Sequence, residues 1–308
     1  MPHDSDATTR ELEAAAELLE QSGDYRVLRR LQQKDVFITE SKGPLRSGVV
    51  LDTETTGRDT EEDKVIELAL VKFDYEPDTA RIVAITGVYS ALEDPGMPIP
   101  PETIAIHGIT DDMVAGKALD DVAIASFMNG VDIVIAHNAS FDRAFIERRL
   151  PLFMDVAWGC SHVQVPWAAE GFGGSKLEFL AWSSGFFYDA HRSEVDCRAL
   201  LELLRKPLPN SHTLPFRYLL DAAAEPSLRL WATGSPFDSK DALKDRGYRW
   251  HVERRVWHKV VAKSVAREET EWLKEHVYRH RPAQIDVEVL DAKILFSNRS
   301  GPRKSKVI

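Results

Sequence analysis

The segment VVLDTETTG, residues 49–57, limits the fold more than any other part of this chain. It joins an apolar run to two acids, Asp52 and Glu54. Side chains two residues apart on a strand point to the same face, so both carboxylates project from one side of a sheet. Such close charges raise each other's pKa, and a divalent cation with oxygen ligands relieves the repulsion. The pattern predicts a metal site at a strand end; two solvated charges are the alternative.

A third acid, Asp142, follows a buried strand expected at 131–136 and opens a helix expected at 141–150. The local sequence also offers a structural explanation. Ser140 can cap the helix, and the helix dipole favours a carboxylate in the first turn by about 0.3 to 1 kcal/mol.

A fourth acid, Asp196, lies in the first turn of a helix expected at 194–204. Ser193 can cap that helix, which would explain Asp196 without catalysis. His191 lies five residues earlier, in the preceding loop, where a histidine is ordinarily exposed. Each residue taken singly favours a structural role, but the four acids in this order, each at the end or start of a regular element, predict one shared site.

The order of elements predicts an α/β fold. Strands are expected at 48–52, 64–73, 81–90, 131–136 and 155–160, and helical segments from Pro100 through Met113, from Leu119 to Met128, and at 141–150, 176–182 and 194–204. Three consecutive strands indicate a meander, and later strands alternate with helices. We therefore expect a mixed sheet with helices on its faces.

Residues 47–205 resemble the DEDD superfamily of 3′-to-5′ exonucleases, in its histidine (DEDDh, DnaQ-like) branch, which includes the proofreading epsilon subunit of bacterial DNA polymerase III. The resemblance rests on D-x-E at Asp52 and Glu54, on H-N-x-x-F-D ending at Asp142, and on H-x-x-x-x-D from His191 to Asp196. It implies a ribonuclease-H-like fold and release of nucleoside 5′-monophosphates from a 3′ end.

The resemblance also implies roles for individual residues. Asp52 would bridge two divalent cations, Glu54 and Asp196 would complete one ion site, and Asp142 would support the other through water. His191 would be the general base, since its unperturbed pKa of about 6.5 suits proton transfer at neutral pH. Mg²⁺ is the expected cofactor, and Mn²⁺ is expected to substitute.

Substrate contacts are expected from the threonines beside the first acids, from the loop AIHGITDDM and from the H-N-x-x-F-D motif. The residues are Thr53, Thr55, Ile106, His107, Asn138 and Phe141. Core packing for Ile106 and a helix-terminal contact for His107 are the alternatives.

The chain divides into four expected parts. These are a helical N-terminal arm (1–45, with a helical hairpin at 7–32), the exonuclease domain (46–206), a linker (207–228) and a small basic α+β accessory domain (229–308). The formal charge is −10, but residues 1–209 carry 20 Lys and Arg against 36 Asp and Glu, whereas residues 210–308 carry 19 against 13. The first part suits cations and the second suits phosphates.

In the accessory domain, residues 229–261 predict strand, turn, helix, turn and strand, followed by a helix at 269–278, a strand at 285–296 and a frayed basic tail. The segment resembles small K-x-x-x-K…G-x-x-W…W modules of DNA-processing enzymes. Trp250 and Trp257 are expected to fill a core, and a basic rim of Arg249, Arg254 and Arg255 is expected to meet nucleic acid.

The expected partners are single-stranded or frayed 3′ ends of DNA, with a DNA polymerase or repair complex and no membrane. An RNA exonuclease of the same fold and a non-catalytic polymerase-docking scaffold are the alternatives. With no apolar run of about 20 residues and no signal-peptide pattern, a cytoplasmic location is expected. Cys160 and Cys197 are expected as buried reduced thiols.

Overall fold

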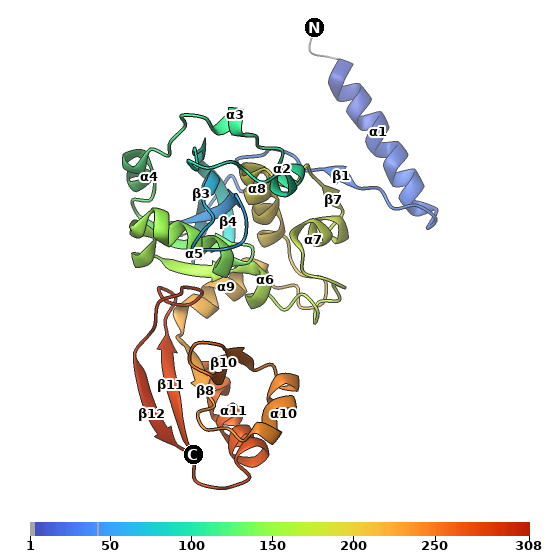
Figure 1. Ribbon diagram of the computed structural model, residues 1–308. Coiled ribbons are helices and arrows are strands. Elements are labelled where there is room, and N and C mark those ends of the chain that lie inside the picture. The colour runs from blue at the N-terminus through green and yellow to red at the C-terminus, as the bar shows by residue number, and fades with distance from the viewer. Residues whose placement is uncertain (1–3, 42) are drawn as a thin grey trace.

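The computed structural model describes residues 4–41 and 43–308, which form two five-stranded sheets with flanking helices (Figure 1). The first sheet has the strand order β4-β3-β2-β5-β6, and the second has the order β12-β11-β8-β10-β9.

The first sheet is mixed, because β2 pairs antiparallel with β3 and parallel with β5. Its strands are β2 (Arg46–Thr55), β3 (Val65–Glu76), β4 (Arg81–Leu92), β5 (Val131–Ala136) and β6 (Ala157–Cys160). Around it lie α2 (Pro101–His107), α3 (Asp111–Val114), α4 (Asp121–Phe127), α5 (Ala139–Arg149), η1 (Pro151–Asp155), α6 (Ser161–Gln164), α7 (Leu177–Ser183), α8 (Ser193–Leu204) and α9 (Pro215–Ala224). The expected α/β fold, a mixed sheet flanked by helices, is confirmed.

Alternating side chains of β2 build the core on both faces of this sheet. Val50 packs with Leu200 of α8 on one face, whereas Leu51 packs with Phe145 and Ile146 of α5 on the other. All five are at most 2% exposed, and burying a side chain of this kind contributes about 1.5 to 3 kcal/mol. The two helices that begin with candidate site residues are therefore fixed on opposite faces of one strand.

The N-terminal segment differs from the expected helical hairpin. Only its first arm is helical, as α1 (Asp4–Gln21), and the prediction of a second helical arm is wrong. The chain instead forms β1 (Arg29–Arg30), which pairs in parallel with β7 (Phe186–Phe187). Backbone bonds from Arg29 to Gly185 and from Leu31 to Phe187 satisfy groups that a helix would have satisfied locally.

Part of the stretch expected as a linker is helix α9. Pro215 lies at its first position, where proline's fixed φ suits a helix start. Phe216 and Leu219 are fully buried in the core of the first sheet. This part of the stretch is therefore packed rather than an open connection, and the division into domains stays a prediction.

The second sheet consists of β8 (Ser227–Trp231), β9 (Arg249–His251), β10 (Val256–Ala262), β11 (Gln284–Leu290) and β12 (Arg303–Val307). Its helical elements are η2 (Phe237–Ser239), α10 (Lys240–Asp245), η3 (Lys263–Val265), α11 (Ala266–Trp272) and the π-helical turn η4 (Leu273–Val277). The strand expected at 285–296 ends at Leu290, and the prediction of a frayed tail is wrong, because residues 303–307 pair antiparallel with β11.

The loop between β11 and β12 returns to the first sheet and contacts α5. Arg143, fully buried, donates to the carbonyl oxygens of Lys293 at 2.5 Å and Leu295 at 2.7 Å, and to Glu147 at 2.7 Å. Trp158 of edge strand β6 donates its backbone N–H to Ala292 at 2.8 Å. We call residues 291–299 the clasp; it joins the second sheet to the helix that carries Asp142.

Two further expectations concern the chain as a whole. Cys160 and Cys197 are both buried and unpaired, as expected. Within residues 4–41 and 43–308, no helix combines the length and apolar character needed to cross a bilayer. The cytoplasmic location stays a prediction.

Candidate active site

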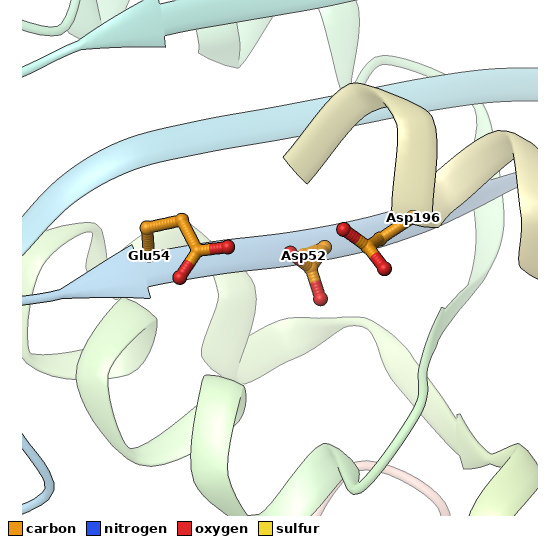
Figure 2. Close-up of side chains that lie close together, drawn as sticks. All are labelled: Asp52, Glu54 and Asp196. Carbon is orange, nitrogen blue, oxygen red and sulfur yellow. The ribbon is translucent and has the colours of Figure 1, made fainter. Parts of the chain in front are cut away.

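Three carboxylates meet where β2 passes the first turn of α8. Asp52 and Glu54 project from the same face of β2, and Asp196 reaches them from α8 (Figure 2). Each offers an oxygen to a group in which all these atoms lie within 4.8 Å of one another. Such a cluster of hard oxygen donors suits a divalent cation.

Asp142 lies beside this group, on the first turn of α5. Its Oδ1 accepts hydrogen bonds from the backbone N–H of Thr53 at 3.1 Å and from the hydroxyl of Thr53 at 2.8 Å. Thr53 lies between Asp52 and Glu54, so these bonds fix α5 to the acidic end of β2. The structure thus brings together all four acids that the sequence singled out.

Burial and mutual repulsion raise the pKa values of the clustered carboxyl groups. Burial, followed by the charges of Asp142, Asp196 and Glu54, raises the pKa of Asp52 well above its usual range. Burial and the charge of Asp196 raise the pKa of Glu54 to about 8. Burial raises the pKa of Asp142 to about 7 against the opposing bonds from Thr53. A cation bound among these oxygens would relieve this repulsion, so the donor set fits a divalent metal.

The two serine caps expected for these helices do not form. Ser193 is the first residue of α8 rather than its cap, and Asp196 itself accepts the backbone N–H of Arg192 at 3.1 Å. Asn138, in the left-handed region at φ 74°, precedes α5 without a side-chain cap bond, and Ser140 bonds to the Asn138 side chain at 3.4 Å. Helix capping by serine therefore does not account for Asp142 or Asp196.

His191 lies in the loop before α8, with an exposed side chain and φ of 67°. A left-handed backbone costs a non-glycine residue on the order of 1 to 2 kcal/mol. Burial raises the pKa of Asp196, and the Tyr188 hydroxyl, the Arg192 N–H and the nearby charge of His191 oppose that rise. His191 is thus next to the carboxylates without belonging to the group that could hold a metal.

The loop residues Ile106 and His107 are placed differently from each other. Ile106 is 52% exposed, so the core-packing alternative is wrong for it. His107 is 6% exposed, and its Nδ1 accepts the backbone N–H of Ile109 at 3.0 Å, which is the helix-terminal contact considered as its alternative. Its Nε2 is buried without a partner among residues 4–41 and 43–308. Neutral His107 therefore carries a proton at Nε2 that is free to be donated.

The remaining predicted contact residues make local bonds. Thr55 donates to the carbonyl of Gly57 at 2.6 Å and shapes the turn after β2. Phe141 packs against Phe145 with ring centroids 5.0 Å apart. Neither arrangement tests the expected contact with a nucleotide, which stays a prediction.

The order of these elements and acids has a match among protein families. Residues 49–204 match the family described as Exonuclease. The chain belongs to this exonuclease family. The expected family and the expected enzyme class, a phosphodiester hydrolase, are thereby confirmed.

Individual exonuclease relatives cover different shares of the chain. DNA polymerase III subunit epsilon of Treponema pallidum (strain Nichols) is 31% identical over 187 residues, which is 58% of this chain and 83% of the relative. DNA polymerase III PolC-type of Listeria innocua is 44% identical over 99 residues, 32% of this chain but only 6% of the relative. A solved Exonuclease X in complex with 5′ overhanging duplex DNA is 30% identical, covers 50% of this chain and 87% of that chain, and has a TM-score of 0.38.

The sequence did not reveal the residues that support the candidate site. Tyr188 donates its hydroxyl to Asp196 at 3.0 Å. Glu67, 3% exposed, lies opposite Glu54 on β3 and accepts from the Arg192 guanidinium at 2.9 Å and the Ser193 N–H at 3.0 Å. An acid inside the apolar run VIELALV was a usable signal for Glu67. Tyr188 had none, because its bond depends on how the loop before α8 folds back.

Proposed function

We propose that the chain is a divalent-metal-dependent 3′-to-5′ exonuclease that removes nucleoside 5′-monophosphates from single-stranded or frayed 3′ ends of DNA. The observation that carries the proposal is the group of Asp52, Glu54 and Asp196, whose oxygens lie within 4.8 Å of one another. The identity with a protein named as a DNA polymerase III subunit supports DNA as substrate, and association with a DNA polymerase or repair complex belongs to the same proposal.

In this proposal Asp52, Glu54 and Asp196 hold two divalent cations together with Asp142. Mg²⁺ is the proposed ion, and Mn²⁺ can substitute, because carboxylate oxygens suit both. When bound, the ions acidify water and neutralise charge on phosphoryl oxygens.

The chain's own residues orient this site and move the proton. The Tyr188 hydroxyl donates to one oxygen of Asp196 and so fixes the orientation of this carboxylate. Thr53 fixes Asp142 through two bonds to one oxygen, so the other oxygen of Asp142 faces away from Thr53. His191 accepts the proton of the attacking water, and His107 donates from Nε2 to the terminal nucleotide.

The assay that tests the proposal compares single-stranded DNA and RNA oligonucleotides of the same sequence, labelled at either the 5′ or the 3′ end. We expect 3′-labelled DNA to release labelled mononucleotide at once in Mg²⁺, and 5′-labelled DNA to shorten stepwise. When the metal is chelated, neither labelled DNA should be hydrolysed. Faster hydrolysis of RNA than of DNA would show that RNA is the preferred substrate. No hydrolysis of either would favour a non-catalytic docking scaffold.

The role of His191 can be separated from metal binding. We expect His191→Ala to reduce turnover by about 10²- to 10⁴-fold, the usual contribution of a general base, with Mn²⁺ affinity nearly unchanged. Single-turnover hydrolysis and calorimetric Mn²⁺ titration measure the two quantities. His212→Ala is the matched control, because His212 is also exposed and left-handed, with φ of 57°. Loss of Mn²⁺ binding in the His191 variant would show that the base assignment is wrong.

A further inference from the structure

Among residues 4–41 and 43–308, the helices that pack on the second sheet lie on one of its faces, and the other face has no helix. Leu230 of β8 and Val261 of β10 point to the helix-covered face, where Ala266 of α11 packs against them. Side chains alternate along a strand, so Trp231, and His258 opposite it on β10, point to the helix-free face. This face is distinct from the carboxylate site of the first sheet.

Arginines gather on the helix-free face around Trp231. The guanidinium carbons of Arg303, Arg254 and Arg229 lie 4.7, 4.9 and 5.6 Å from the centroid of the Trp231 ring. Trp231 is 2% exposed although no helix covers it, because these cations cover the ring. Arg249, in register with His258, extends the same face to edge strand β9. We call Arg229, Arg249, Arg254 and Arg303 the arginine face.

Two acids on this face offset part of this charge. Asp286 lies in register with Trp231 and accepts from Ser305 Oγ at 2.6 Å. Glu288 is fully buried and accepts from Trp231 Nε1 at 2.9 Å, with Arg229 at 3.3 Å and Arg303 at 3.6 Å. Among residues 4–41 and 43–308, neither Arg249 nor Arg254 has a carboxylate within 4.0 Å. The bond from Arg254 to Ser300 Oγ at 3.3 Å leaves its charge uncompensated.

The positive charge of the face affects the pKa of His258, which lies among the arginines. Burial, together with the charges of Arg229, His251 and Arg249, lowers the pKa of His258 to about 4. Arg229 Nε is also buried without an acceptor among the described residues. The face thus offers unused donors and positive potential, because its four arginines outnumber its two acids, Glu288 and Asp286.

The charge distribution of the whole chain indicates what this face binds. Residues 1–209 carry 20 basic against 36 acidic side chains and repel a polyanion outside the metal site, whereas residues 210–308 carry 19 against 13. We propose that the arginine face binds the phosphodiester backbone of a single DNA strand, with Arg249 and Arg254 contacting phosphates. This inference rests on the proposed function, because the strand is the one whose 3′ end the nuclease shortens.

The test uses the full chain with Arg249→Gln and Arg254→Gln together. The probe is a fluorescent oligothymidylate of about 30 nucleotides, longer than the roughly 4 to 16 that one small module covers, in chelator so that nothing is cut. Each lost phosphate contact on a single strand should reduce the slope of log affinity against log salt by about 0.7. We expect the double variant to lose about 1.4 of that slope.

The matched control is Lys240→Gln with Lys244→Gln, which removes the same charge from exposed side chains of α10 on the helix-covered side. Its slope should equal that of the unchanged protein. An unchanged slope in the arginine variant would overturn the proposal, and so would an equal loss in the lysine control, which would reflect net charge alone. Tighter, arginine-dependent binding of duplex DNA or of RNA would overturn the single DNA strand as occupant.

The outcome is independent of catalysis. Because the titration contains no metal, a failed arginine face leaves the exonuclease proposal standing. Conversely, a chain that hydrolyses no nucleic acid in Mg²⁺ loses its proposed function whatever the salt slope shows.

Discussion

Asp52→Ala should abolish both Mn²⁺ binding and hydrolysis, with turnover falling by at least about 10⁴-fold, the upper end of what one general acid or base contributes. The expected loss exceeds that of His191→Ala because Asp52 is central to the carboxylates that can hold a metal. Calorimetric Mn²⁺ titration and single-turnover hydrolysis measure it.

The control for Asp52 is Asp189→Ala. Asp189 is 82% exposed in its side chain and pairs only at the surface, with Arg30 at 2.8 Å. That variant should bind Mn²⁺ and hydrolyse DNA like the unchanged protein. If Asp52→Ala retained Mn²⁺ affinity, the proposed site would be in the wrong place, and hydrolysis that survived without Mn²⁺ affinity would refute the metal dependence.

Arg143→Met should destabilise the protein by about 3 to 5 kcal/mol, the usual result of removing one partner of a buried ion pair. Within the part of the chain that the structure describes, the change leaves Glu147 with Arg299 at 3.1 Å as its one ionic partner. It also leaves the carbonyls of Lys293 and Leu295 without the Arg143 donor. Urea unfolding followed by fluorescence measures the free energy. Turnover should fall as well, because Asp142 is the preceding residue of the same helix.

Arg30→Met is the comparison for Arg143. Its ion pair with Asp189 is exposed, and such pairs contribute about 0 to 1 kcal/mol. The free energy of unfolding should therefore change by no more than that. A similarly small loss in Arg143→Met would show that the clasp is a surface contact and does not hold α5.

The acidic site was predictable because strand geometry fixes side-chain direction. Asp52 and Glu54 had to share a face once 49–57 was a strand. Helix α5 follows strand β5, which pairs in parallel with β2, so the first turn of α5 had to begin near the end of β2 that carries these acids. The helix caps were not predictable from residue type. At the start of α8, the N–H of Ser193 donates to Glu67, which is distant in the sequence, and the N–H of Arg192 donates to Asp196, which was expected to bind metal. Ser193 does not cap the helix.

Two of the failures in the remaining fold, at Arg29 and in the basic tail, result from strand pairing with other segments of the chain. The helical pattern around Arg29 was overridden by parallel pairing with Phe186, 157 residues away in sequence order. The basic tail became β12 because β11 offers an edge. Helix α9 was hidden by the turn formers that precede it, although Phe216 and Leu219 carried an apolar signal. Local propensity cannot report such partners.

The clasp has a consequence for synthesis of the protein. Arg143 precedes its partner Lys293 by 150 residues, a stretch that a ribosome makes in roughly 8 to 30 s at about 5 to 20 residues per second. Throughout that interval the emerging α5 lacks the carbonyl oxygens that its buried guanidinium requires. The helix that carries Asp142 therefore gains its contacts with residues 291–299 only after nearly the whole chain has been made.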